Sequence, residues 1–147
     1  MADADILLVE DNHGDVNLVE QTFEERSLPG ELHTVQTGDR TLDWLHQRGE
    51  FPDAPRPDLV VLDLNLPAIS GHDLLDEIKS DPQLKRIPVI VITGSQSETD
   101  ITEAYERSAN ACLNKPVDPD EFGDLFQSVT DFWVSTATLP PQSPTLE

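Results

Sequence analysis

Five short apolar runs, each followed by a segment of helical period, constrain the fold of this chain more than any other feature. After the first run, for example, Val16, Val19 and Phe23 recur on one face of a predicted helix. This alternation is typical of a parallel sheet wrapped by helices, so we predict an α/β, doubly wound fold with five parallel strands. The predicted strands are residues 6–9, 32–36, 59–63, 88–93 and 111–114.

The runs differ in polarity, which indicates their places in the sheet. The run from Leu59 to Asp63 is apolar on both faces until its last residue, as expected of a central parallel strand. The run 32–36 is weaker and more polar, so we expect it nearer an edge.

The last helical segment, about residues 119–133, carries the clearest apolar stripe in the chain. Phe132 and Trp133 continue that spacing, so core packing is the default interpretation for both, with a homodimer contact as the alternative. Residues 139–147 are rich in proline. We predict one domain over residues 1–134 and a disordered C-terminal tail over 135–147.

Acidic residues dominate the charge, because 29 Asp and Glu oppose nine Lys and Arg and give a net charge of -20. Such a surface repels nucleic-acid phosphates and anionic membranes, so we expect neither as a direct partner. The acids are spread through the chain rather than gathered in a tail. Our hypothesis is a surface adapted to very high salt, that is, a halophilic source, and the alternative is an ordinary acidic protein.

Length and cysteine content also limit the possibilities. With 147 residues and 37% hydrophobic content, we expect one domain with a real core. The single cysteine, Cys112, cannot form an internal disulfide, which agrees with a reducing compartment. The first ten residues lack the positive charge and long apolar segment of a signal peptide, and no run approaches the ~20 apolar residues of a membrane span. We predict a cytoplasmic protein.

Polar side chains follow four of the predicted strands where each strand ends. They are Glu10 and Asp11 after the first, Asp63 after the third, Thr93 after the fourth and Lys115 after the fifth. The carboxyl ends of parallel strands meet at one edge of an open sheet, so we expect these five side chains to lie together. Three carboxylates repel one another unless cations offset their charge. Lys115 supplies one positive charge, and a hard, oxygen-preferring ion such as Mg²⁺ would supply the rest.

This combination suits phosphoryl transfer. An oxygen of Asp63 can attack a phosphorus atom while Mg²⁺, Lys115 and the Thr93 hydroxyl share the developing charge, and the product is an acyl phosphate.

At this point the chain resembles the receiver domain of two-component response regulators, over roughly residues 5–133. The matching motifs are VEDN at 9–12, LDLNLP at 62–67, Gly71, ITGS at 92–95 and KP at 115–116. The resemblance implies the flavodoxin-like (βα)5 fold of the chemotaxis regulators, with strand order 2-1-3-4-5. It further implies that the partner is a sensor histidine kinase and that the subgroup is the small stand-alone regulators associated with phytochrome-type kinases.

The same resemblance implies a role for each site residue. Asp63 becomes the phosphoacceptor, and Thr93 and Lys115 contact the phosphoryl group. The Mg²⁺ ligands are Asp11 and Asp63 directly, Glu10 through water and Asn65 through its backbone carbonyl. The Lys115–Pro116 peptide bond is expected to be cis, an isomer that is far less costly before proline than elsewhere.

One position departs from the family pattern. Cys112 stands three residues before the lysine, where the family has Tyr or Phe that couples to the threonine. Two interpretations stay open: Tyr105 partly substitutes for that ring, or Cys112 acts only as a small buried hydrophobe.

The leading functional hypothesis is a phosphorylation-dependent interaction module that is not an enzyme on other substrates and whose downstream target the sequence does not name. One alternative is a degenerate receiver that binds partners without phosphorylation. The other is a haloacid-type phosphatase, which also uses an Asp after a strand, but which needs a second aspartate where this chain has Asn65.

Overall fold

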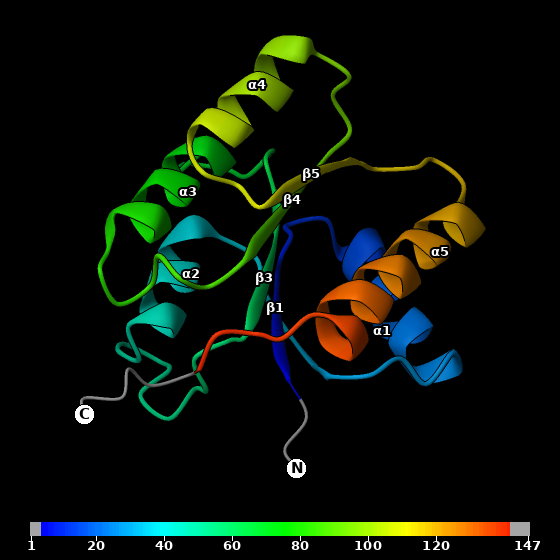
Figure 1. Ribbon diagram of the computed structural model, residues 1–147, viewed down its shortest axis with the longest axis horizontal. Helices are drawn as coiled ribbons and strands as arrows, with labels where there is room; N and C mark the ends of the chain where they lie inside the picture. The colour runs from blue at the N-terminus through cyan, green and yellow to red at the C-terminus, as the bar shows by residue number, and fades with distance from the viewer. Residues whose placement is uncertain (1–3, 142–147) are drawn as a thin grey trace.

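The computed structural model describes residues 4–141, and its centre is a five-stranded parallel sheet (Figure 1). The strand order is β2-β1-β3-β4-β5, which confirms the predicted doubly wound, flavodoxin-like topology. The strands are β1 (Asp5–Val9), β2 (Glu31–Val35), β3 (Leu59–Asp63), β4 (Val89–Thr93) and β5 (Ala111–Asn114).

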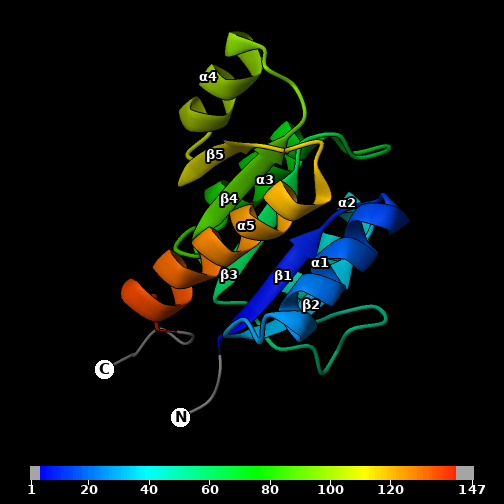
Figure 2. The same cartoon turned by 90° about the vertical axis from the view of Figure 1, so that its right-hand side faces the viewer.

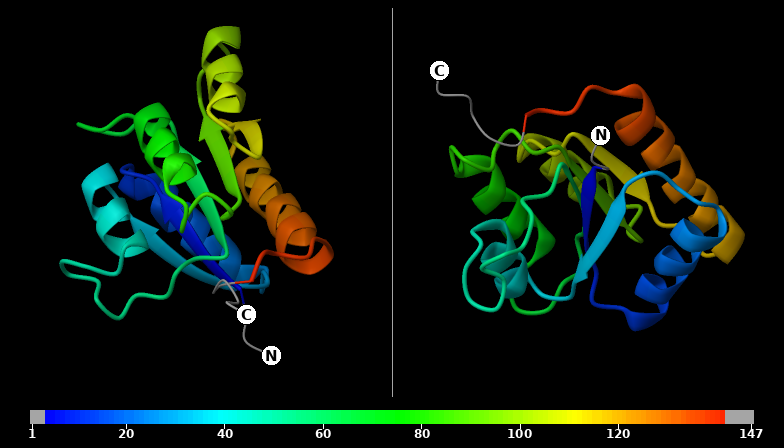
Figure 3. Two further views of the ribbon diagram at one scale, coloured as in Figure 1. Left: turned by 60° about the vertical axis from the view of Figure 1, so that its left-hand side comes forward. Right: turned by 90° about the horizontal axis from the view of Figure 1, so that it is seen from below.

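Five α-helices cover the two faces of this sheet. They are α1 (His13–Glu25), α2 (Gly38–Leu45), α3 (Gly71–Ser80), α4 (Glu98–Glu106) and α5 (Pro119–Thr130). Helices α1 and α5 pack side by side on one face, and α2, α3 and α4 lie on the other (Figures 1 and 2). Figure 3 shows from two further directions that the sheet separates these two layers.

Each layer has its own apolar core. On the face of α1 and α5, Leu8 and Val61 pack with Val19 and Phe126. The opposite faces of the same strands pack against α2, α3 and α4 in a second cluster. Burying apolar side chains on both faces of a sheet is what a parallel sheet requires.

Strand β3 occupies the centre of the sheet, since it pairs with β1 on one side and β4 on the other. All five of its residues, Asp63 included, are buried. The more polar β2 pairs only with β1 and forms one edge, as predicted, and β5 forms the other. The apolar run of β3 therefore carries one acidic side chain into the middle of the carboxyl edge.

Each α-helix begins with a side-chain cap a few residues after a strand ends. Asn12, Thr37, Ser70, Ser97 and Asp118 each accept a hydrogen bond from a backbone N–H of the first helical turn. Such caps satisfy N–H groups that would otherwise lack a partner and fix where a helix starts. They hold the helix N-termini close to the edge where the predicted site residues lie.

Gly71 marks the closest approach of a helix to this edge. A Cβ atom at position 71 would lie 2.5 Å from the Cα atom of Leu64 and 2.9 Å from the carbonyl oxygen of Asp63. Only glycine allows α3 to start so near the residue that follows Asp63.

The C-terminal helix ends differently from the prediction of one helix over 119–133. Helix α5 stops at Thr130 and continues as a π-helical segment over Asp131–Thr136. Trp133 packs partly buried against the core cluster beside α5, as predicted, but Phe132 is 53% exposed. Most of the predicted tail follows this segment, and residues 142–147 lie outside the described part of the chain. Within residues 4–141, no helix has the length and apolar character needed to cross a bilayer.

Candidate phosphoryl-acceptor site

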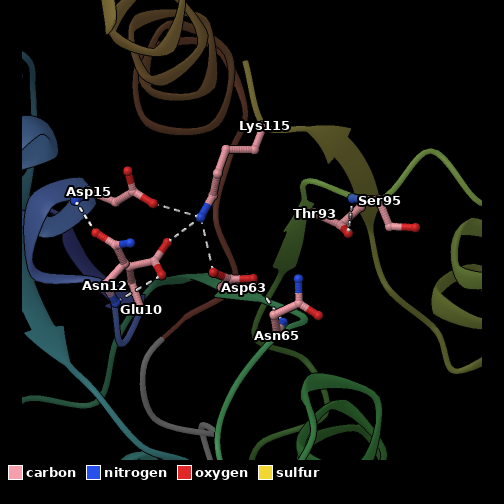
Figure 4. A network of polar contacts seen from close by, with 8 residues as sticks. All are labelled: Glu10, Asn12, Asp15, Asp63, Asn65, Thr93, Ser95 and Lys115. Atoms are coloured by element: carbon pink, nitrogen blue, oxygen red, sulfur yellow. Dashed lines mark hydrogen bonds and ion pairs between the residues drawn. The ribbon is translucent and has the colours of Figure 1, made fainter. Parts of the chain in front are cut away.

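The carboxyl ends of β1, β3 and β5 bring two acids and a lysine into direct contact (Figure 4). Glu10 follows β1 and is 3% exposed, and Asp63 ends β3 and is 5% exposed. Lys115 follows β5 and reaches across the edge toward both. Lys115 therefore meets residues that lie 52 and 105 positions before it in the chain at one point of the sheet edge.

The Lys115 ammonium nitrogen is the centre of this network. It donates hydrogen bonds to Glu10 Oε1 at 2.8 Å, to Asp15 Oδ2 at 2.9 Å and to Asp63 Oδ2 at 3.1 Å. Burial acts to lower the pKa of Lys115, but its hydrogen bonds to Glu10 and Asp15 and the charges of Asp63 and Glu10 outweigh this and raise the pKa. The lysine is a permanent cation at the carboxylate of Asp63.

The single positive charge of Lys115 does not fully neutralise the negative charge of the buried carboxylates. Burial, and then the neighbouring Asp63 carboxylate, raise the pKa of Glu10 to about 7, although Lys115 opposes the shift. Oxygen atoms of Glu10, Asp11 and Asp63 lie within 4.8 Å of one another, and Asp11 is exposed to solvent. Three converging carboxylate oxygens with too little positive charge fit a hard divalent cation, which prefers oxygen ligands.

The backbone of Asn65 lies next to the Asp63 carboxylate. Its N–H donates a hydrogen bond to Asp63 Oδ1 at 2.9 Å, so one Asp63 oxygen faces Asn65 and the other faces Lys115. The role of the Asn65 carbonyl as a metal ligand stays a prediction.

Thr93 lies at the same edge but outside the lysine network. It is 1% exposed, and its hydroxyl oxygen accepts a hydrogen bond from the N–H of Ser95 at 3.0 Å. Figure 4 shows this pair at a distance from the contacts that surround Lys115. The structure thus places Thr93 at the predicted strand end, bonded to its own loop.

The Lys115–Pro116 peptide bond is trans, so the expected cis bond is wrong for this structure. The two isomers before proline differ by only about 0.5–1 kcal/mol, which is too little for a motif to decide between them.

Cys112 and Tyr105 are joined by a hydrogen bond between the Cys112 backbone and the Tyr105 side-chain hydroxyl. The Cys112 N–H donates to the Tyr105 hydroxyl oxygen at 3.1 Å, and Tyr105 is 51% exposed. The Cys112 side chain packs against the core cluster beside α3 and α4, and burial, with the charge of Asp100, raises the pKa of its thiol. This placement is that of a small hydrophobe.

Asp15 was not among the site residues predicted from the sequence. The structure places it in the first turn of α1, with its carboxylate on Lys115. Its partner lies 100 positions away in the chain, and the local pattern carries no signal for a contact between the start of α1 and a lysine that follows β5.

Comparison with known proteins identifies the family. Residues 6–127 match the model of the response regulator receiver domain. This chain belongs to that family. It is 41% identical to response regulator Rcp1 of Synechocystis sp. over 135 residues, covering 92% of each chain. It is also 34% identical to a probable methanogenesis regulatory protein, FilR2, of Methanothrix harundinacea, covering 92% of this chain and 86% of that one.

Two solved structures of receiver proteins superimpose closely on this one. The Mn²⁺-bound form of response regulator Rcp1 has a TM-score of 0.87 at 40% identity, covering 94% of this chain and 99% of that one. The phosphorylated cyanobacterial phytochrome response regulator RcpA has a TM-score of 0.90 at 42% identity, covering 95% and 100%. The predicted family, and its resemblance to phytochrome-associated regulators, are confirmed.

Proposed function

We propose that this receiver domain accepts a phosphoryl group on Asp63 from a phosphohistidine of a sensor histidine kinase. The observation that carries the proposal is the contact of the buried Asp63 carboxylate with Lys115, inside a group of three converging carboxylates. A structure of phosphorylated RcpA and one of Mn²⁺-bound Rcp1, both about 40% identical to this chain, support it.

Asp63, Lys115 and Thr93 have separate roles in the proposed reaction. An Asp63 oxygen forms the new O–P bond while the N–P bond of the donor breaks, and the imidazole nitrogen keeps the electron pair. Lys115, already 3.1 Å from Asp63 Oδ2, stabilises the negative charge on the phosphoryl oxygens. The Thr93 hydroxyl would add a neutral hydrogen bond from the neighbouring strand end.

A divalent ion, Mg²⁺ in our proposal, would be held by Glu10, Asp11, Asp63 and the backbone carbonyl of Asn65. When bound it would neutralise charge on the transferring phosphoryl group. The chain's own part is to present these oxygens at one edge, two of them on buried side chains that cannot easily move away.

The remaining parts of the proposal concern context. The chain acts as a stand-alone regulator in the cytoplasm, catalyses only its own phosphorylation and dephosphorylation, and passes the signal by phosphorylation-dependent protein contact. The net charge of -20 argues against direct binding to nucleic acid or an anionic membrane. The exposed ring of Phe132 is one candidate for a homodimer contact.

Incubation with Mg²⁺ and acetyl phosphate, followed by intact mass measurement, tests the proposal. We expect one phosphoryl adduct in the parent chain and none in the Asp63→Asn variant. The Asp58→Asn variant, altered near the opposite end of β3, is the matched control and should keep the adduct. No adduct in the parent chain would favour a degenerate receiver, and steady turnover of phosphate esters would favour a phosphatase.

A further inference from the structure

The Lys115 ammonium group is shared by three carboxylates, and one of them stands outside the acidic group at the strand ends. Glu10 and Asp63 belong to that group, whereas Asp15 comes from the first turn of α1. An ammonium has three N–H donors, and in the described chain all three reach carboxylates (Figure 4). Lys115 therefore has no donor left for a phosphoryl oxygen unless one of these contacts is given up.

Asp15 is fixed in this position by the start of α1. Its N–H donates to the capping side chain of Asn12 at 3.0 Å, and its carboxylate lies at a helix N-terminus, where negative charge is favoured. Its side chain is 27% exposed, whereas that of Glu10 is 3% exposed. Water can replace the ammonium at Asp15, but it cannot easily do so at the buried carboxylate of Glu10.

We propose that Asp15 is a positioning residue that competes with the phosphoryl group for Lys115. The inference rests on the proposed function, because it requires a phosphoryl group on Asp63. That group brings oxygen atoms to Lys115 and converts the Asp63 carboxylate to an acyl phosphate. Of the two partners that remain free carboxylates, Glu10 and Asp15, the contact to Asp15 is the less costly to lose. Asp15 thus holds the lysine toward α1 in the unphosphorylated state. By doing so it weakens the interaction of Lys115 with the phosphoryl group.

Removing the negative charge of Asp15 should therefore strengthen binding of a phosphoryl analogue. With Mg²⁺ present, we expect Asp15→Asn to bind beryllium fluoride about two- to fivefold more tightly than the parent chain, the effect of one partly exposed ion pair. Asp15→Glu keeps the carboxylate and should restore the parent affinity. The matched control is Asp39→Asn, which removes one charge from the first turn of α2 on the opposite face of the sheet. A structural defect would weaken binding, so tighter binding cannot come from damage to the fold.

Each other outcome counts against the inference. Unchanged or weaker binding by Asp15→Asn, in a parent chain that binds the analogue, overturns it and leaves the proposed function standing. An equal gain in Asp39→Asn, or in Asp15→Glu, overturns it too, because the effect would then not depend on the contact with Lys115. A parent chain that neither binds beryllium fluoride nor takes up a phosphoryl group from acetyl phosphate overturns the proposed function and this inference with it.

Discussion

Replacing Glu10 with glutamine should remove a pH-dependent loss of stability from the metal-free protein. In the folded chain, burial and the Asp63 carboxylate raise the pKa of Glu10 to about 7, whereas a glutamate in an unfolded chain titrates near ~4.3. Between these values the folded chain holds a proton that the unfolded chain has lost. The free energy of unfolding therefore falls as pH rises through this window and levels off above the folded pKa.

The size of the effect follows from the same pKa. From about pH 6 to about pH 8, a group with a pKa of about 7 releases most of its proton from the folded chain, and the integrated loss of stability is about 1 kcal/mol. The parent chain and Glu10→Gln differ in no other titratable group, so the pH dependence that the two chains share cancels in the comparison.

Urea unfolding at the two pH values, in constant KCl with a chelator present, measures this difference. The parent chain should lose about 1 kcal/mol more than Glu10→Gln between about pH 6 and about pH 8. Adding Mg²⁺ should stabilise the parent chain more at the higher pH, because the metal binds the ionised carboxylate. Identical pH dependence in the two chains would refute the argument that Glu10 is a buried, incompletely compensated acid.

Three further predictions concern packing, salt and the thiol. Gly71→Ala should lower the free energy of unfolding, measured by urea titration, by about 3 kcal/mol, because the new Cβ would clash with the backbone of Leu64. Gly94→Ala is the control: no described atom lies within 4 Å of its new Cβ, so it should change the free energy of unfolding little. If the charge of -20 is an adaptation to high salt, the melting temperature should rise from low to molar KCl, and equal values would exclude that hypothesis. Because burial raises the pKa of Cys112, alkylation of the folded chain should be slower than that of the urea-unfolded chain, and equal rates by mass spectrometry would contradict its placement.

The fold could be predicted because the apolar residues that mark each strand in the sequence are also the residues that the sheet buries. The run from Leu59 to Leu62 is apolar on both faces, and only the centre of a parallel sheet buries both faces of a strand. The positions of Glu10, Asp63 and Lys115 at the ends of predicted strands were then enough to predict that they share one edge of the sheet. No side-chain contact had to be known.

What the sequence could not predict depends on tertiary packing or on small energy differences. The contact of Asp15 with Lys115 joins the first turn of α1 to the residue after β5, 100 positions apart in the chain, and no local spacing predicts it. The trans bond before Pro116 reflects a preference of about 0.5–1 kcal/mol. The π-helical turn from Asp131 changes the hydrogen-bond pattern without breaking the apolar stripe, so Phe132 was expected inside and lies outside.

The most direct test of the central claim is to locate the phosphoryl group on the chain. Borohydride reduction after treatment with Mg²⁺ and acetyl phosphate converts an aspartyl phosphate to homoserine, which peptide mass spectrometry can place in the sequence. We predict homoserine at position 63 alone. Homoserine at Asp11 or Asp15 in place of Asp63, or none in a chain that carries the phosphoryl adduct, would contradict the assignment of Asp63 as the acceptor.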